Sequence, residues 1–126
     1  MKILLDTSAW VEYLLGSEIG EKVNQYLKDN EIITSVITLF ELSYKADRER
    51  WNIKNCLNFI KIESQIIGIK ESSIIEFGRL YNETRKKESS FGFADAIVLL
   101  TANTEKVQIV TKDNHFRNIE NAVVLK

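Results

Sequence analysis

The stretch KILLDTSAW, residues 2–10, runs three apolar residues directly into Asp6, which two hydroxyl side chains, Thr7 and Ser8, then follow. An uninterrupted apolar run of this kind indicates a short parallel strand that is buried on both faces of a sheet. The carboxylate at its end has two explanations: Asp6 either caps the next helix or holds a charged group. Because Ser8 is at least as good a cap, we expect Ser8 to free Asp6 for the second role.

Outward from this stretch, apolar runs alternate with segments of helical periodicity along the whole chain. Strands are predicted at residues 2–5, 31–35, 65–69, 107–111 and 122–125, and helices at 8–16, 18–30, 36–49, 52–62, 71–87 and 94–103. Alternating strands and helices imply a parallel sheet between two helical layers. We therefore expect an α/β fold, a three-layer αβα arrangement with a central parallel sheet of about five strands.

Length and composition restrict the class of protein. A chain of 126 residues predicts a single domain over residues 1–126. No apolar stretch approaches the roughly 20 residues of a membrane helix, and we expect no contact with a membrane. The single cysteine, Cys56, is typical of a reducing compartment, so a cytoplasmic location is expected. With one cysteine and one histidine, the chain has too few such ligands for a Cys/His zinc site.

Four acidic residues lie next to apolar segments: Asp6, Glu41, Asp95 and Asp113. Asp6 ends the first strand, Glu41 lies early in the helix after the second strand, and Asp113 follows the fourth strand. Strand ends and the starts of the following helices share one edge of a parallel sheet. Topology therefore brings these three acids together, and Asp95 joins them if its helix starts at the same edge.

Each acid also has an ordinary explanation. Asp6 serves as a helix cap, Glu41 pairs with Lys45, Asp95 favours a helix dipole, and Asp113 occupies a turn. One shared cause explains all four together, since a cluster of carboxylates is tolerated only where protons or cations neutralise it. Oxygen ligands select hard ions, so the sequence predicts a site for Mg²⁺ or Mn²⁺.

Four segments resemble the PIN domain family, in the same order along the chain. LLDTSAWVEYL (4–14) resembles the family's opening strand with its terminal Asp, and TLFELSYKA (38–46) resembles its Glu-bearing helix. FADAIVLLTAN (93–103) resembles its third acidic segment, and IVTKDNHFRNI (109–119) resembles its terminal segment. In size, the chain is similar to VapC toxins of toxin–antitoxin modules.

The resemblance implies a metal-dependent ribonuclease of αβα architecture that acts on RNA. It also implies a homodimer and a cognate antitoxin protein as partner. Carried over by position, the acidic site that binds Mg²⁺ or Mn²⁺ and performs catalysis consists of Asp6, Glu41, Asp95 and Asp113. Ser8 or Thr111 would support these carboxylates by hydrogen bonding.

Basic and aromatic residues suggest further contacts. Arg48, Lys112 and Arg117 are candidates for binding the RNA backbone. The lone histidine, His115, is expected in a surface turn away from the substrate. The stretch from Trp10 to Leu15 and the helix around Phe40 and Tyr44 carry many large apolar residues, so we expect a partner helix to dock there.

Alternative interpretations remain at this stage. A free-standing RNA-processing PIN nuclease would have the same four acids and no antitoxin. A receiver-like domain of two-component signalling also binds Mg²⁺ through aspartates, but it needs an Asp at the end of the third strand, where this chain reads IIGIKESS. A PIN-like domain that binds without cleaving, or a purely structural α/β domain, would not need all four acids.

Overall fold

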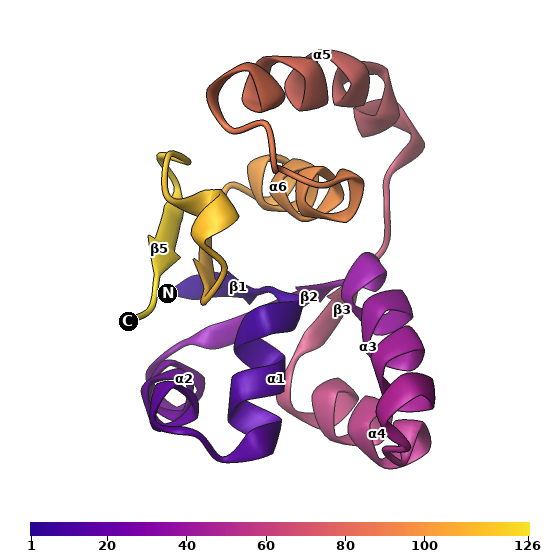
Figure 1. Cartoon of the computed structure of the whole chain (residues 1–126), viewed down its shortest axis with the longest axis vertical. Coiled ribbons are helices and arrows are strands. Elements are labelled where there is room, and N and C mark those ends of the chain that lie inside the picture. The colour runs from indigo at the N-terminus through magenta and orange to yellow at the C-terminus, as the bar shows by residue number, and fades with distance from the viewer.

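A computed structural model describes all residues, 1–126. Its centre is a five-stranded sheet in the order β3-β2-β1-β4-β5, and every neighbouring pair is parallel. The strands are β1 (Lys2–Leu5), β2 (Glu31–Ser35), β3 (Gln65–Ile67), β4 (Gln108–Thr111) and β5 (Ala122–Val124). The expected three-layer α/β fold with a parallel sheet is confirmed (Figure 1).

Helices fill every connection except the last, which holds a short 3-10 turn. They are α1 (Thr7–Leu15), α2 (Glu18–Asp29), α3 (Val36–Glu49), α4 (Ile53–Glu63), α5 (Glu71–Lys87), α6 (Phe93–Glu105) and the turn η1 (Asn114–Phe116). The predicted helix and strand bounds agree to within two residues at each end, and only η1 was not expected. No helix has the length and apolar character that a bilayer crossing requires.

The strands bury both of their faces, in two separate hydrophobic clusters. On β1, Ile3 and Leu5 face the cluster that α1, α2, α3 and α4 cover, whereas Leu4 faces the cluster that α6 covers. The alternation follows from the two-residue repeat of a strand. Helix α5 packs on α6 and forms the outermost layer on that side (Figure 1).

Trp10 is the largest side chain of the first cluster and is 0% exposed. Its indole N–H donates to Thr34 Oγ1 at 3.0 Å, and its ring meets Tyr13 and Phe59 edge-on. The expectation that Trp10 belongs to a docking surface is therefore wrong, because this side chain packs inside the fold. Leu15, in contrast, is exposed at the end of α1.

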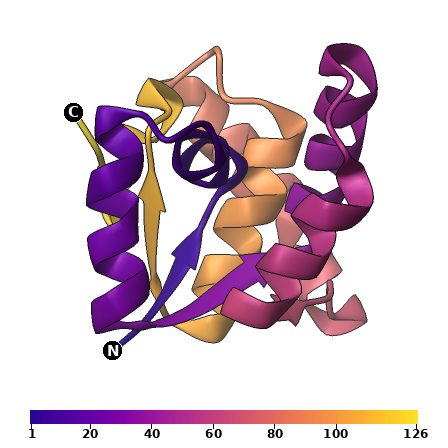
Figure 2. The ribbon, with the colours of Figure 1, turned by 90° about the horizontal axis from the view of Figure 1, so that it is seen from below.

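The strand order determines where a ligand site can form. β1 lies between β2 and β4, so the chain leaves β1 toward one side and later returns to the other (Figure 2). In open α/β sheets, ligands bind at the carboxyl ends of the strands beside such a reversal. The receiver-like alternative requires the order 2-1-3-4-5, and the observed order excludes it.

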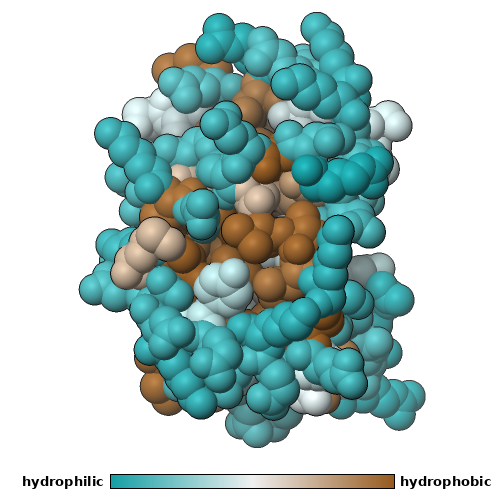
Figure 3. Space-filling view, turned by 90° about the vertical axis from the view of Figure 1, so that its left-hand side faces the viewer, coloured by the Kyte–Doolittle hydropathy of each residue, from teal (hydrophilic) through white to brown (hydrophobic).

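The β5 side of the sheet has little cover. The three residues of β5 are half-buried, and β4 is the only neighbour of this strand. Figure 3 shows hydrophobic side chains gathered in the middle of this face, with hydrophilic side chains around them. The hydrophilic rim limits the size of the apolar area that reaches solvent.

Two helical glycines allow a matched test of the packing. A Cβ on Gly20 in α2 would lie 2.3 Å from the backbone oxygen of Glu12, whereas a Cβ on Gly78 in α5 would meet nothing within 4 Å. We expect Gly20→Ala to destabilise the fold by about 2 kcal/mol or more, because α1 and α2 must separate. Gly78→Ala should stabilise it by up to about 1 kcal/mol. Urea unfolding of both variants measures the difference, and equal effects would contradict the close α1–α2 packing.

Candidate active site

The four acids selected from the sequence line one open pocket at the carboxyl edge of the sheet. Asp6 follows β1, Glu41 lies on α3, Asp95 lies in the first turn of α6, and Asp113 follows β4. The other residues that line the pocket are Thr7, Ser8, Val11, Glu12, Lys45, Val98 and Lys112. The structure thus brings together Asp6, Glu41 and Asp113, as the topology predicted, and Asp95 joins them because α6 starts at the same edge.

Asp6 is buried and is held from three directions. Its Oδ1 accepts hydrogen bonds from the Ala9 backbone N–H at 3.0 Å and from the Ser8 hydroxyl at 2.8 Å, and its Oδ2 accepts one from Thr111. Asp6, not Ser8, is therefore the N-cap of α1, and the expectation about Ser8 is wrong. Although Asp6 caps α1, its carboxyl group still lies in the wall of the pocket.

Burial dominates the electrostatics of Asp6. Desolvation raises the pKa of this carboxyl from 3.8 to about 7, although its three hydrogen bonds act in the opposite direction. The nearby Asp113 raises the pKa further. Without a cation in the pocket, a substantial fraction of Asp6 therefore holds a proton near neutral pH.

Glu41 faces the pocket and does not pair with Lys45. The Thr7 hydroxyl donates to Glu41 Oε1, and Lys45 instead pairs with Glu49 at 3.0 Å. Burial is the main cause that raises the pKa of Glu41, and Asp95 and Asp113 contribute through like-charge repulsion. The ordinary explanation of Glu41 as an exposed partner of Lys45 is thus wrong.

Asp95 and Asp113 complete the cluster from two further elements. Asp95 Oδ2 accepts the Gly92 backbone N–H at 2.8 Å, which caps α6. Burial raises the pKa of Asp95, and the charge of Asp113 raises it further. Asp113 caps η1 by accepting the His115 backbone N–H at 2.9 Å.

Ser8 and Thr111 both donate hydrogen bonds to Asp6, the supporting role that was expected of them. Ser8 accepts the Lys112 backbone N–H at 2.9 Å, and its hydroxyl lies 3.0 Å from that of Thr111. Thr111 also accepts the Asp113 backbone N–H at 2.9 Å. These two hydroxyls connect the end of β4 to the start of α1 and so orient Asp6.

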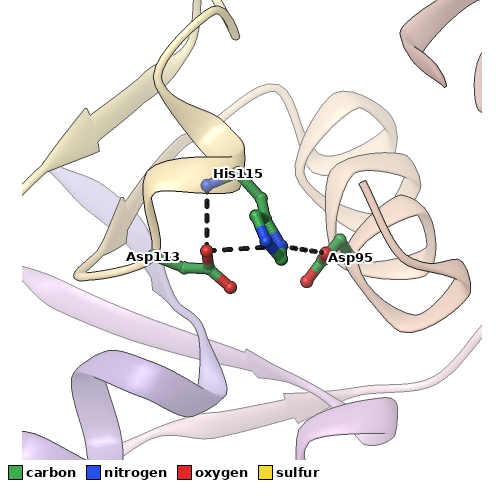
Figure 4. A group of neighbouring side chains, drawn as sticks. All are labelled: Asp95, Asp113 and His115. Carbon is green, nitrogen blue, oxygen red and sulfur yellow. Dashed lines mark hydrogen bonds and ion pairs between the residues drawn. The ribbon is translucent and has the colours of Figure 1, made fainter. Parts of the chain in front are cut away.

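His115 is the site residue that the sequence interpretation missed. Its ring Nδ1 lies 3.2 Å from Asp95 Oδ2 and 3.4 Å from Asp113 Oδ1 (Figure 4). His115 does lie in a turn at the surface, as expected, but its ring faces the acidic residues, so the expectation that it lies away from the site is wrong. An Asp side chain that accepts the N–H two residues later forms an Asx turn, so the spacing of Asp113 and His115 indicates this backbone contact, but no sequence signal indicates the contact of the ring with Asp95.

The three predicted RNA-binding residues differ in their surroundings. Lys112 lines the pocket, and its Nζ lies 3.7 Å from Glu12 Oε1. Arg117 pairs with Glu88 at 2.7 Å, and Arg48 lies over the ring of Tyr44 at 5.3 Å. Lys45, which was not among the predicted residues, lines the pocket beside Lys112.

The donor set fits a divalent cation. One ligand atom each from Asp95, Asp113 and His115 lie within 4.8 Å of one another, and Glu41 and Asp6 face the same pocket. Carboxylate oxygens with at most one imidazole suit Mg²⁺ or Mn²⁺. The raised pKa values of Asp6, Glu41 and Asp95 mean that the pocket disfavours their ionised forms. A bound cation would stabilise these ionised forms.

Three comparisons with known proteins agree with this geometry. The family model described as PIN domain matches residues 3–122. Ribonuclease VapC1 from Methanocaldococcus jannaschii is 27% identical over 120 residues, which cover 94% of this chain and 82% of that protein.

Solved structures of the same fold include toxin–antitoxin complexes. VapBC2 from Rickettsia felis, bound to a DNA fragment from its promoter, has a TM-score of 0.77 at 23% identity and covers 98% of this chain and 97% of its own. VapC20 from Mycobacterium tuberculosis, described as a sarcin–ricin loop cleaving toxin, has a TM-score of 0.73 at 14% identity, with 98% and 99% covered.

The raised pKa of Asp6 predicts how stability depends on pH in the presence of EDTA. A folded-state pKa of about 7, against 3.8 in the unfolded chain, means that the folded chain binds this proton more tightly. The free energy of unfolding should therefore fall as the pH rises from about 4 to about 7. Asp6→Asn keeps a capping oxygen and removes the charge, so it should flatten this dependence and raise the melting temperature at pH 8 by several degrees.

Thermal unfolding across this pH range, with Asp47→Asn as control, measures the effect. Asp47 is exposed on α3, so its amide variant should keep the wild-type slope. An Asp6→Asn variant that melts below the wild type at pH 8 would show that the ionised carboxylate stabilises the fold as a cap or ion-pair partner.

Proposed function

The chain belongs to the PIN domain family, and from this premise we propose that it is a divalent-metal-dependent ribonuclease, the toxin of a toxin–antitoxin pair. The observation that carries the proposal is the convergence of four carboxylates from separate elements on one pocket at the carboxyl edge of the sheet. Capping accounts for hydrogen bonds of Asp6, Asp95 and Asp113, but it does not require these acids to meet Glu41 in one pocket, where burial and like-charge repulsion raise the pKa values of Asp6, Glu41 and Asp95.

Asp95, Asp113, Glu41 and Asp6 would hold Mg²⁺ or Mn²⁺ at this pocket. When bound, such an ion polarises a phosphate oxygen and lowers the pKa of water, which favours hydrolysis of a phosphodiester bond. Both Asp6 oxygens accept hydrogen bonds from the chain, which fixes the direction in which this carboxylate would face the ion. Asp95 and Asp113 lie at the open side beside His115.

Glu41 is the best placed proton acceptor among the four. Thr7 holds one of its oxygens, and the other has no hydrogen-bond donor from the chain. Its pKa is raised by burial, which brings the carboxyl group closer to the range in which a general base is effective. We assign to Glu41 the removal of a proton from the attacking water.

The lysines at the pocket rim would position the RNA. Lys45 and Lys112 line the pocket, and an ammonium group at either position attracts a phosphate without reading the base. Arg117 and Arg48 do not line this pocket and pair with Glu88 and the Tyr44 ring, so we place them in a secondary role in RNA binding.

The antitoxin proposal has two supports. A nuclease of this kind harms its own cell unless a partner blocks it, and the neighbouring folds with TM-scores above 0.7 include VapBC complexes from Rickettsia felis and Salmonella typhimurium. Phe40 and Tyr44 on α3 are each 66% exposed, and each directly precedes a pocket residue, Glu41 and Lys45. A partner helix anchored on these two side chains would lie beside the acidic pocket.

We also propose that the chain forms a homodimer. The support is a second exposed apolar area, between α5 and α6, where an open pocket is lined by hydrophobic side chains alone. These are Ile69, Ile74, Phe77, Phe93, Ile97 and Leu100. A contiguous apolar area of this kind on a folded chain marks an interaction site.

Removal of the metal or of single carboxylates tests the nuclease proposal. The purified chain should cleave RNA with Mn²⁺, and excess EDTA should abolish cleavage. Asp95→Asn and Asp6→Asn should each lower the cleavage rate about 100-fold or more, because the carboxylate charge that holds the ion is lost. The rate is measured on a labelled RNA under single-turnover conditions.

Asp47→Asn makes the same chemical change on the exposed surface of α3 and should cleave at the wild-type rate. Cleavage that persists undiminished in EDTA, or in Asp6→Asn, would contradict a carboxylate-bound metal. An RNase contaminant is excluded if independent preparations of one variant have the same activity and different variants purified in the same way do not.

Co-expression with the product of the neighbouring gene tests the toxin assignment. We expect the two chains to copurify and the complex to lose RNase activity. Tyr44→Ala should weaken the complex about tenfold or more and leave cleavage unchanged, because an exposed aromatic anchor is lost. Ile75→Ala is the control, since Ile75 is 88% exposed on the far helix α5.

Size-exclusion chromatography at micromolar concentration and titration calorimetry provide the measurements. Separate elution of the two chains would favour the free-standing RNA-processing nuclease over the toxin.

A further inference from the structure

The imidazole of His115 lies between two carboxylates of the pocket and is fixed there by the turn η1. Asp113 Oδ1 accepts the His115 backbone N–H, and the next residue, Phe116, is 1% exposed and packs on Phe91. The backbone therefore has little freedom to carry the ring away. Figure 4 shows the ring extending from η1 and lying between Asp113 and Asp95.

The spacing of the three side chains matches that of ligands around one ion. Their ligand atoms lie within 4.8 Å of one another, and Nδ1 lies 3.2 Å from Asp95 Oδ2 and 3.4 Å from Asp113 Oδ1. For metal–ligand bonds of about 2.1 Å in an octahedron, adjacent ligands are about 3.0 Å apart and opposite ones about 4.2 Å. Shifts of a few tenths of an ångström would place all three atoms on one ion.

We propose that His115 Nδ1 is a ligand of the divalent ion, together with Asp95 and Asp113, and that it makes the site prefer Mn²⁺ over Mg²⁺. This inference rests on the proposed metal-dependent function. A neutral imidazole offers a lone pair at one ring nitrogen, which binds Mn²⁺ and the later first-row ions better than Mg²⁺. A purely acidic site would lack this source of selectivity.

A competing role for His115 uses the same geometry. The ring can donate an N–H from Nδ1 to Asp95 or Asp113 and so act as a positioning residue outside the ion's ligands. The two roles differ in which atom occupies the space between the ring and the carboxylates. In the first role an ion lies there, and in the second a proton does.

Electron spin echo envelope modulation of the Mn²⁺-loaded, tag-free full chain distinguishes the two roles. Because the chain contains one histidine, a directly coupled imidazole ¹⁴N signal has a single source. We expect this coupling in the wild type and its loss in His115→Gln. The wild-type spectrum is decisive by itself, even if the variant does not fold.

Calorimetric titration with Mn²⁺ and with Mg²⁺ provides the second readout. His115→Gln should raise the Kd for Mn²⁺ about tenfold or more, and the Kd for Mg²⁺ by about threefold or less. Asp95→Asn is the matched control and should weaken the binding of both ions, since a carboxylate serves either ion.

The outcomes separate this inference from the proposed function. Mn²⁺ binding without ¹⁴N coupling, or equal losses for the two ions in His115→Gln, would overturn the ligand role and leave the carboxylate-bound metal intact. A wild-type chain that binds no Mn²⁺ would overturn both.

Discussion

The site depends on one constraint, the burial of a carboxyl group at the end of the central strand. Burial of an unpaired charge is strongly unfavourable, so Asp6 must be satisfied by hydrogen bonds or by a proton. The bonds come from Ala9, Ser8 and Thr111, which belong to the start of α1 and the end of β4. By satisfying Asp6, these groups fix the two chain segments between which the pocket opens.

The strand order explains why the remaining acids meet there. With β1 between β2 and β4, the segments that follow these three strands lie side by side at one edge. Glu41 reaches the edge from α3 and Asp113 from the end of β4, although they are far apart in sequence. α6 contacts β2 and β4 and starts at the same edge, which adds Asp95. No long loop is needed, because the topology supplies the proximity.

Much of the fold and of the acid cluster could be predicted because both depend on simple periodicity. Parallel strands read as apolar runs, and acids directly after such runs must share an edge. The errors arose where two neighbouring residues could each cap a helix, or where a short turn determines the direction of a side chain. Asp6 and Ser8 were both suitable caps, and only the backbone conformation and the bond to Ala9 distinguish them. His115 was missed because η1, a three-residue turn without periodicity, aims its ring.

The two sides of the pocket have different physical characters. Asp6 is buried and saturated with hydrogen bonds, so its position is set by the fold and varies little with what occupies the pocket. Asp95 and Asp113 lie at the accessible side, where the His115 imidazole, 39% exposed, faces both carboxylates. A rigid carboxyl can define the pocket while the accessible groups exchange protons, ions or phosphate oxygens. This division allows a cluster of like charges to persist in a stable fold, because hydrogen bonds offset the burial of Asp6 and the other carboxylates can be neutralised by solvent protons or cations.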